Sequence, residues 1–309
     1  MKKLSFRSIV LFLLLIPLLM FSSEVTEGAR QGLLLWYNSV VPALFPFMVL
    51  SGLIVSGGGI SQIMTPFYWV LHPVLGLSRE GCYVLVSGLL CGYPMGAKTC
   101  AEFVNDGRIS ITEGKYLMAI CNHPSPMFIL GYMYPWFAER ISIRTLLLSI
   151  YAPILFIAIA AKQVYPFESE RETSNEPLQN NASTSSADEA ILSSTEVLCK
   201  IGGYLVLFSI AIVFIRKLTI IPGQIKLCFI GIMEMTTGIR EFGELTDWKI
   251  GYIASVAALT FGGFSGIFQT KSVLGNKKKA GLSIRPYIFW KTAHAILSVG
   301  LAYLLCNKN

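Results

Sequence analysis

Long apolar runs alternate with short polar segments along the whole chain. A run of about 20 apolar residues is long enough to cross a bilayer as a helix. Apolar runs predict helices at 9–21, 31–55, 141–164, 191–215, 225–239, 251–270 and 287–306; Pro42 and Pro46 lie within the second run and Pro153 within the third. Three more apolar runs, at 60–77, 83–101 and 115–134, contain sharper interruptions by Gly, Pro or polar residues. The pattern therefore predicts an all-α, polytopic integral membrane protein, with some helices broken or re-entrant.

One polar segment is much longer than the others. Between residues 167 and 190 there are six acidic residues, one Arg and runs of Ser, Thr and Asn. A segment with so few apolar residues cannot bury enough surface to fold. We therefore expect a hydrophilic acidic linker between two membrane halves. The predicted division of the chain is an N-terminal membrane helix at 1–24, a first membrane repeat at 25–165, the linker at 166–190 and a second membrane repeat at 191–309.

Composition supports the membrane assignment. Of the 309 residues, 53% are hydrophobic and 14% are charged, whereas soluble domains carry about 25% charged residues. The net charge of +7 comes from basic clusters at 2–7, 216–217 and 277–279, a pattern typical of cytoplasmic loops that contact anionic lipid. No soluble domain offers a basic face, so nucleic acid is not an expected partner.

The N-terminal apolar run resembles a signal peptide because Lys2, Lys3 and Arg7 precede it. However, Phe21 would lie near the cleavage site, where small residues are required. We therefore expect an uncleaved first helix with its N-terminus inside, in a protein of the cell membrane.

The residues that carry enzyme and cofactor chemistry do not form recognisable motifs. The seven cysteines lie mostly in apolar surroundings without a CxxC pair, so no disulfide framework and no metal site are predicted. The sequence contains no HExxH motif and no convincing GxSxG motif. It also contains no paired carboxylates within the membrane segments. We expect no catalytic residue, no cofactor and no enzymatic activity.

The stretch GYPMGAKT, residues 92–99, resembles a phosphate-binding loop only superficially. That loop requires G-x-x-x-x-G-K-[ST] so that its backbone N–H groups surround a phosphate. Here Gly92 and Gly96 are one residue too close, Ala97 precedes Lys98, and Pro94 has no N–H to donate. Nucleotide binding is therefore not expected.

A broken helix accounts better for this stretch. Gly92 and Pro94 interrupt an apolar run, Met95 begins a half-helix, and Lys98 and Thr99 follow within its first turns. Backbone that leaves helical geometry inside a bilayer needs protein or a wet cavity to satisfy its polar groups. The N-terminus of the half-helix then attracts anions. The alternative is that the stretch is an interfacial turn and that Lys98 extends to the membrane surface.

A second break and an internal repeat extend the argument. Residues 122–126 read Asn-His-Pro-Ser-Pro within an apolar run. Placing residues 90–94 over 261–265 aligns Gly92 with Gly263 and Pro94 with Ser265; the same offset aligns Lys98-Thr99 with Gln269-Thr270. Such repeats with broken helices are typical of transporters. The predicted substrate-binding residues are Gly92, Tyr93, Pro94, Gly96, Lys98, Thr99, Asn122, Ser125, Gly263, Ser265, Gln269 and Thr270.

Three other polar residues in apolar runs receive structural interpretations. We interpret His123 as a cap for freed backbone, although a proton relay is an alternative. His294 is interpreted as a packed, hydrogen-bonded histidine. Glu234 lies near a charged turn and is interpreted as interfacial.

Three motifs together resemble a known family. SGLLCGYPMGAKT, CNHPSPMFILG at 121–131 and LTFGGFSGIFQ at 259–269 are similar in order and spacing to the YlbJ-type sporulation integral membrane proteins, within the nucleoside-recognition or gate-domain group. The pair His123-Pro124 departs from the less proline-rich break expected there.

The resemblance implies two gate-like repeats and a location in the mother-cell membrane around the forespore. It also implies transport of dipicolinic acid, a small organic dianion, toward the forespore. Two alternatives stay open: a scaffold that recruits other sporulation membrane proteins, and a gate-domain carrier for another solute such as a nucleoside. Membrane lipid is the remaining expected partner.

Overall fold

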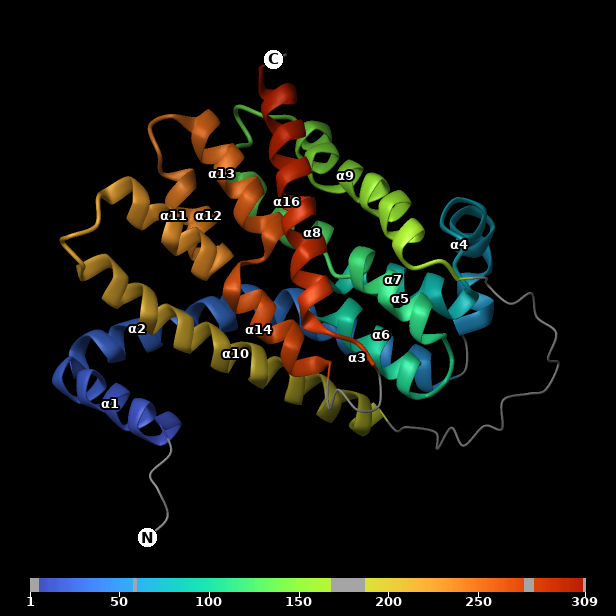
Figure 1. The fold of residues 1–309 in the computed structure, drawn as a ribbon, viewed down its shortest axis with the longest axis horizontal. Helices are drawn as coiled ribbons and strands as arrows, with labels where there is room; N and C mark the ends of the chain where they lie inside the picture. The colour runs from blue at the N-terminus through green and yellow to red at the C-terminus, as the bar shows by residue number, and fades with distance from the viewer. Residues whose placement is uncertain (1–5, 58–59, 168–186, 275–280, 308–309) are drawn as a thin grey trace, which may run out of the picture.

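The computed structural model describes residues 6–57, 60–167, 187–274 and 281–307, which form helices and contain no strand. In chain order the elements are α1 (Phe6–Met20), α2 (Ser22–Leu35), the π-helical η1 (Trp36–Val40), α3 (Val41–Ser56), α4 (Ile60–Leu75), α5 (Arg79–Cys91), α6 (Met95–Asn105), α7 (Ile111–Ile120), α8 (Pro126–Phe128), the π-helical η2 (Ile129–Met133), the 3₁₀ η3 (Tyr134–Trp136), α9 (Ile143–Val164), α10 (Ala187–Lys217), α11 (Gly223–Met233), α12 (Met235–Gly243), α13 (Trp248–Phe261), α14 (Gly263–Val273) and α16 (Ile284–Cys306). Figure 1 shows their arrangement.

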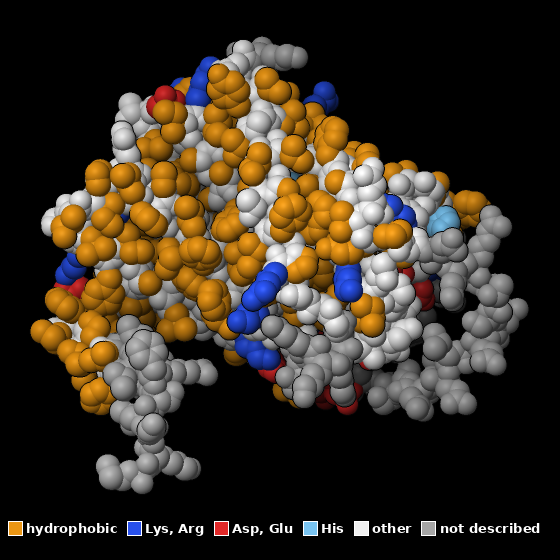
Figure 2. Space-filling view, in the orientation of Figure 1, with side chains coloured by type: hydrophobic (Ala, Val, Ile, Leu, Met, Phe, Trp, Pro, Cys, Tyr) orange, Lys and Arg blue, Asp and Glu red, His pale blue; other side chains and the backbone are white. Residues whose placement is uncertain are grey.

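The described helices confirm an all-α, multi-pass membrane protein. Five of them are long and apolar enough to cross a membrane, and a sixth candidate is a pair of helices bent by 98°. Figure 2 shows hydrophobic side chains over most of the visible face. The five spans are Ser22–Ser56, Ile143–Val164, Ala187–Lys217, Trp248–Val273 and Ile284–Cys306, and the bent pair is Gln62–Leu75 with Arg79–Cys91.

Local sequence explains where several helices begin and end. Ser78, Ser110 and Ser142 precede α5, α7 and α9, and each side-chain oxygen accepts a hydrogen bond from a backbone N–H of the first turn. Helices α5 and α13 end at Gly92 and Gly262, with φ of 77° and 83°. Only glycine adopts this region without a side-chain clash, so these residues fix the two ends.

Some predicted boundaries differ from the structure. Helix α10 begins at Ala187, so residues 187–190 of the predicted linker are helical. The predicted span 31–55 is part of a longer helical stretch that begins at Ser22. The predicted span 225–239 is not one helix, because it breaks at Glu234. Most of the linker and the basic cluster 277–279 lie outside the described residues.

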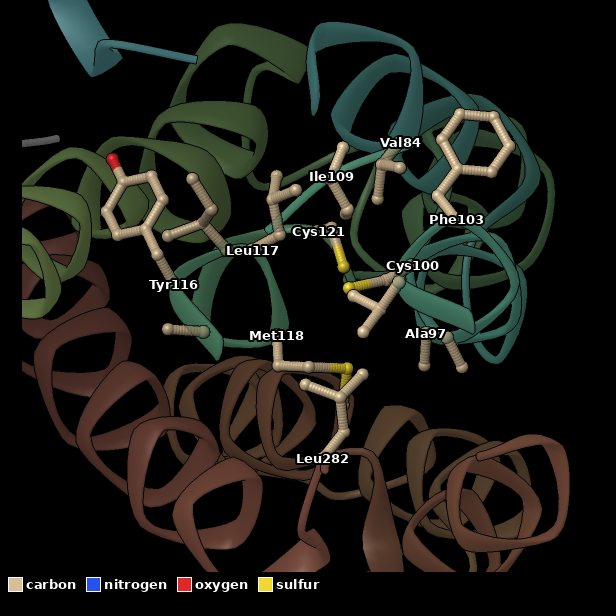
Figure 3. Packing of buried hydrophobic residues seen from close by; sticks show 14 of the residues in the cluster. Val84, Ala97, Cys100, Phe103, Ile109, Tyr116, Leu117, Met118, Cys121 and Leu282 are labelled. Atoms are coloured by element: carbon tan, nitrogen blue, oxygen red, sulfur yellow. The ribbon is translucent and has the colours of Figure 1, made fainter. Parts of the chain in front are cut away.

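Close helix contacts join the two halves of the chain. Helices α2 and α10 lie against each other, and a Cβ added at Gly28 or Gly32 would come within 2.7 Å of a backbone Cα of α10. Small residues permit such contact between membrane helices. The largest core cluster combines α4–α7 with residues of α9, α14 and α16. In Figure 3, Met118 of the first half meets Leu282 of the second.

Candidate functional site

Four helix breaks, two from each half of the chain, surround one cavity. The first lies at 92–94 between α5 and α6, and the second at 121–125 between α7 and α8. The third is Glu234 between α11 and α12, and the fourth is Gly262 between α13 and α14. The cavity has a volume of about 50 Å³. One water molecule needs about 10–15 Å³ on the same measure, so the cavity has room for several. Its lining is Val40, Ala43, Leu44, Cys91, Gly92, Tyr93, Pro124, Ser125, Phe128, Ile201, Leu205, Glu234, Met235, Thr236, Gly262, Ser265, Gly266 and Gln269.

Tyr93 connects the first break to the third and fourth. Its hydroxyl donates to the Leu259 carbonyl at 2.7 Å and lies 2.7 Å from the Met235 sulfur. Its ring also lies within 3.6 Å of where a Cβ on Gly262 would stand. Leu259 is in the last turn of α13, whose carbonyls lack helical partners. Tyr93 therefore satisfies backbone that the fourth break exposes.

Asn122 connects the second break to both halves. Its Nδ2 donates to Thr270 Oγ1 at 3.0 Å and to the Tyr287 hydroxyl at 2.9 Å, while its Oδ1 accepts from the Ala97 N–H at 3.4 Å. One buried amide thus joins the first turn of α6 to α14 and α16. Such a network is stable only because its members satisfy one another.

Neighbouring groups also hydrogen-bond the backbone polar groups of the proline-rich second break. Ser125 Oγ accepts from the Phe128 N–H at 3.2 Å, and the Tyr151 hydroxyl of α9 donates to the Pro124 carbonyl at 2.8 Å. The pair His123-Pro124, which departs from the break expected in the YlbJ-type proteins, therefore belongs to an ordered segment. Pro124 and Ser125 of this segment line the cavity.

The beginning of α14 forms a polar wall of the cavity. Its N-cap residue is Gly262, so no side chain caps the helix. Ser265, Gly266 and Gln269 line the cavity one after another, and Gln269 Nε2 donates to Ser265 Oγ at 2.9 Å. An uncapped N-terminus presents free N–H groups and the positive end of the helix dipole. This end of α14 is therefore suited to a negatively charged group.

Glu234 lies on the cavity wall, so its interpretation as interfacial is wrong. The residue is 2% exposed. Its carboxylate accepts from the Thr236 N–H at 3.0 Å, from the Thr237 N–H at 2.7 Å and from the Thr236 hydroxyl. It is thus the N-cap of α12, where a helix dipole favours negative charge. The acidic residue followed by Met-Thr-Thr within an apolar run was the sequence signal for this cap.

The predicted site residues divide into three groups. Five line the cavity: Gly92, Tyr93, Ser125, Ser265 and Gln269. Asn122 and Thr270 lie behind them and are hydrogen-bonded to each other. The remaining five, Pro94, Gly96, Lys98, Thr99 and Gly263, are not part of the lining.

Packing explains why those five residues lie elsewhere. A Cβ on Gly96 would collide with the Cys121 carbonyl, so this glycine allows α6 to approach the second break. Pro94 is the N-cap of α6, and its carbonyl accepts from the Lys98 N–H at 3.0 Å. Gly263 packs against the backbone at the third break, and Thr99 is buried.

Lys98 does not reach the cavity, which corrects its predicted place there. Its ammonium group donates to Ser193 Oγ of α10 at 3.1 Å and pairs with Glu102 Oε1 at 3.3 Å, one turn further along α6. The side chain therefore points toward α10 rather than toward the break. The sequence alignment pairs Lys98 with Gln269, but only Gln269 lines the cavity.

The pairing of the two halves is shifted by one residue. The residues that end α5 and α13 in positive φ are Gly92 and Gly262, whereas the sequence alignment paired Gly92 with Gly263. The first break contains three residues and the fourth only one, and the half-helices α6 and α14 that follow them are each 11 residues long. The two gate-like repeats stay a prediction.

Lys291 is a buried lysine that is not among the predicted site residues. It lies in α16 and is 1% exposed. Its Nζ donates to the Asn122 carbonyl at 3.1 Å and lies 5.2 Å from the centre of the Tyr93 ring. A lysine within an otherwise apolar span was itself the signal, because ionisable residues at membrane depth usually mark functional sites.

Comparisons with known proteins identify a relative with a described role. No protein-family model and no solved structure matches the chain. The chain is similar to the sporulation integral membrane protein YlbJ of Bacillus subtilis (strain 168), at 24% identity over 90% of this chain and 77% of the relative. This homology supports a membrane role in sporulation. It also confirms the resemblance to the YlbJ-type sporulation integral membrane proteins that the three motifs predict.

Proposed function

We propose that the protein carries a small organic anion across the membrane. The observation that supports this proposal is the meeting of four helix breaks from both halves at one cavity. Breaks within apolar helices expose backbone polar groups, and they persist where protein or a cavity satisfies those groups. Carriers place their substrate sites at such discontinuous helices.

The charges around the cavity favour an anion. The uncapped N-terminus of α14 faces the cavity, and Lys291 lies behind Tyr93. Glu234 also lines the cavity, and its negative charge would repel an anion. However, both of its carboxylate oxygens accept hydrogen bonds at the start of α12. The positive end of that helix offsets its charge.

Dipicolinic acid is the anion that the family resemblance implies, moved from the mother-cell membrane toward the forespore. Its two carboxylates suit N–H donors at the start of a half-helix. A nucleoside is the alternative solute, and a scaffold role that acts through the linker is the alternative function. A transport assay distinguishes all three.

Exchange in liposomes tests the proposal. The purified full chain is reconstituted in vesicles that contain unlabelled dipicolinate, and entry of labelled dipicolinate is followed. We expect exchange that excess uridine does not inhibit. Exchange of labelled uridine instead would identify a nucleoside carrier, and exchange of neither solute would contradict carriage and favour a scaffold.

A variant pair links the exchange to the cavity. Gln269→Ala removes a polar group from the lining, and we expect about a tenfold slower exchange, which corresponds to one hydrogen bond of about 1.4 kcal/mol. Gln62→Ala on the exposed side of α4 is the matched control and should behave like wild type. Equal rates for the two variants would remove Gln269 from the site.

A further inference from the structure

Three ionisable side chains lie together behind the cavity wall. His123 is in the second break, and Lys291 and His294 are on α16, less than one turn apart. They are 2%, 1% and 0% exposed. The two imidazole rings meet edge to face, with their centres 4.7 Å apart. The backbone carbonyl of Asn122, next to His123, accepts from Lys291.

The histidines retain unused proton-binding capacity. His294 Nε2 lies 2.8 Å from the Ile150 carbonyl; because a carbonyl only accepts, Nε2 carries the hydrogen. Nδ1 of a neutral His294 then has a free lone pair, and it has no hydrogen-bond partner among the described residues. Neither ring nitrogen of His123 has one there either. Buried imidazole nitrogens are usually paired, so three unpaired nitrogens at one place need an explanation.

Within the described part of the chain, no carboxylate acts on these rings to balance a charge. Among the described residues, the ionisable groups near the cluster are Tyr93 at the first break, Cys121 at the second, Tyr151 on α9 and Tyr287 on α16. The carbonyls of Ile120 and Thr260 also approach the rings, outside hydrogen-bond geometry.

Glu234 interacts with Tyr93 rather than with the rings, and its carboxylate is bound to the start of α12. A second positive charge beside Lys291 is therefore unfavourable while the cavity holds no anion. Two like charges at such short range in a buried site repel strongly.

We propose that His123, Lys291 and His294 form the proton-binding site that couples anion carriage to a proton gradient. This inference rests on the proposed function. The step is a simple protonation: a hydronium ion gives its proton to a free imidazole lone pair, one N–H bond forms, and water leaves. The anion in the cavity balances the added positive charge through the wall formed by Tyr93 and Asn122. Release of the anion on the other side then favours release of the proton.

The geometry supports mutual dependence of the two ligands. Lys291 contacts both wall residues, by its hydrogen bond to the Asn122 carbonyl and by its place over the Tyr93 ring. Binding of either ligand must then strengthen binding of the other by the same factor, because coupling free energies are reciprocal. Lys98 cannot take this role, because Glu102 already balances its charge.

The test uses the full chain in liposomes, with the membrane potential clamped by potassium and valinomycin. Exchange of labelled dipicolinate at equal pH reports carriage alone. Net accumulation under an imposed pH gradient, with an internal pH dye, reports coupling. For one proton per anion we expect roughly tenfold accumulation per pH unit, together with dipicolinate-dependent proton entry.

The three histidines of the chain supply the variants. His123→Asn and His294→Gln should weaken the apparent affinity for dipicolinate, keep exchange at equal pH when dipicolinate is saturating, and lose accumulation under the gradient. His72→Gln on α4, whose ring contacts the Leu77 carbonyl, is the matched control and should keep both. If the cluster has a purely structural role, the variants should lower exchange and accumulation together. Proton entry into vesicles with the wild-type protein then shows whether carriage is coupled to protons.

The possible outcomes separate the two proposals. Wild-type exchange without proton entry would overturn the coupling inference and leave the carrier intact. Absence of wild-type exchange would overturn the carrier itself. Variants that still accumulate dipicolinate under the gradient would remove the histidines from the coupling site.

Discussion

Replacement of Tyr93 by Phe should destabilise the protein although it preserves the shape of the side chain. The Tyr93 hydroxyl donates to the Leu259 carbonyl at 2.7 Å, and Tyr93 is 7% exposed. Leu259 lies within the last four residues of α13, where carbonyls lack a helical partner. The substitution leaves this carbonyl buried without its donor, which costs about 1–3 kcal/mol.

Denaturant unfolding of the purified protein in detergent measures this cost. Tyr303→Phe is the matched control, because Tyr303 is 57% exposed on α16 and its replacement should change stability by less than about 0.5 kcal/mol. We expect a clear loss of stability for Tyr93→Phe alone. Equal stability of the two variants would refute the argument that the hydrogen bond from Tyr93 to Leu259 stabilises the contact between the first and fourth breaks.

Further substitutions test other parts of the account. Lys98→Ala should leave dipicolinate exchange within about twofold of wild type, because its ion pair is peripheral to the cavity and such pairs stabilise by at most ~1 kcal/mol; a complete loss would return Lys98 to the site. Gly88→Leu should abolish folded protein in membranes, since a Cβ there collides with the Cys121 carbonyl, whereas Gly203→Leu has open space; equal protein levels on immunoblots would contradict this. Replacement of residues 168–188 by a neutral Gly/Ser linker should preserve exchange and spore maturation; failure of maturation alone would favour the scaffold.

The helix breaks of the first half could be predicted because their signals are local. Gly92 and Pro94 interrupt an apolar run, and so does the polar, proline-rich segment that begins at Asn122. A residue type that cannot continue a helix marks the break wherever the neighbouring helices lie. The same reasoning found the break near Gly263, but two successive glycines left its position ambiguous by one residue.

The orientation of side chains around the breaks could not be predicted. Sequence places Lys98 within the first turns of α6, but the rotation of that helix against α10 decides that the ammonium meets Ser193. Glu234 resembles an interfacial residue until α12 is seen to begin directly after it. Lys291 and His294 lie far in sequence from the second break that they contact. These are tertiary facts that one sequence does not contain.

Cysteine accessibility at Ser265 tests the central claim most directly, namely that the four breaks enclose a solute cavity. In a background with the native cysteines replaced, Ser265→Cys lines the cavity, whereas Thr99→Cys lies outside the lining; the two native side chains are equally buried, at 1% and 2% exposed. The account predicts that a small water-soluble thiol reagent labels position 265, that dipicolinate slows this labelling, and that position 99 reacts far more slowly. Labelling at position 265 that dipicolinate does not slow, or equal labelling at both positions, would contradict it.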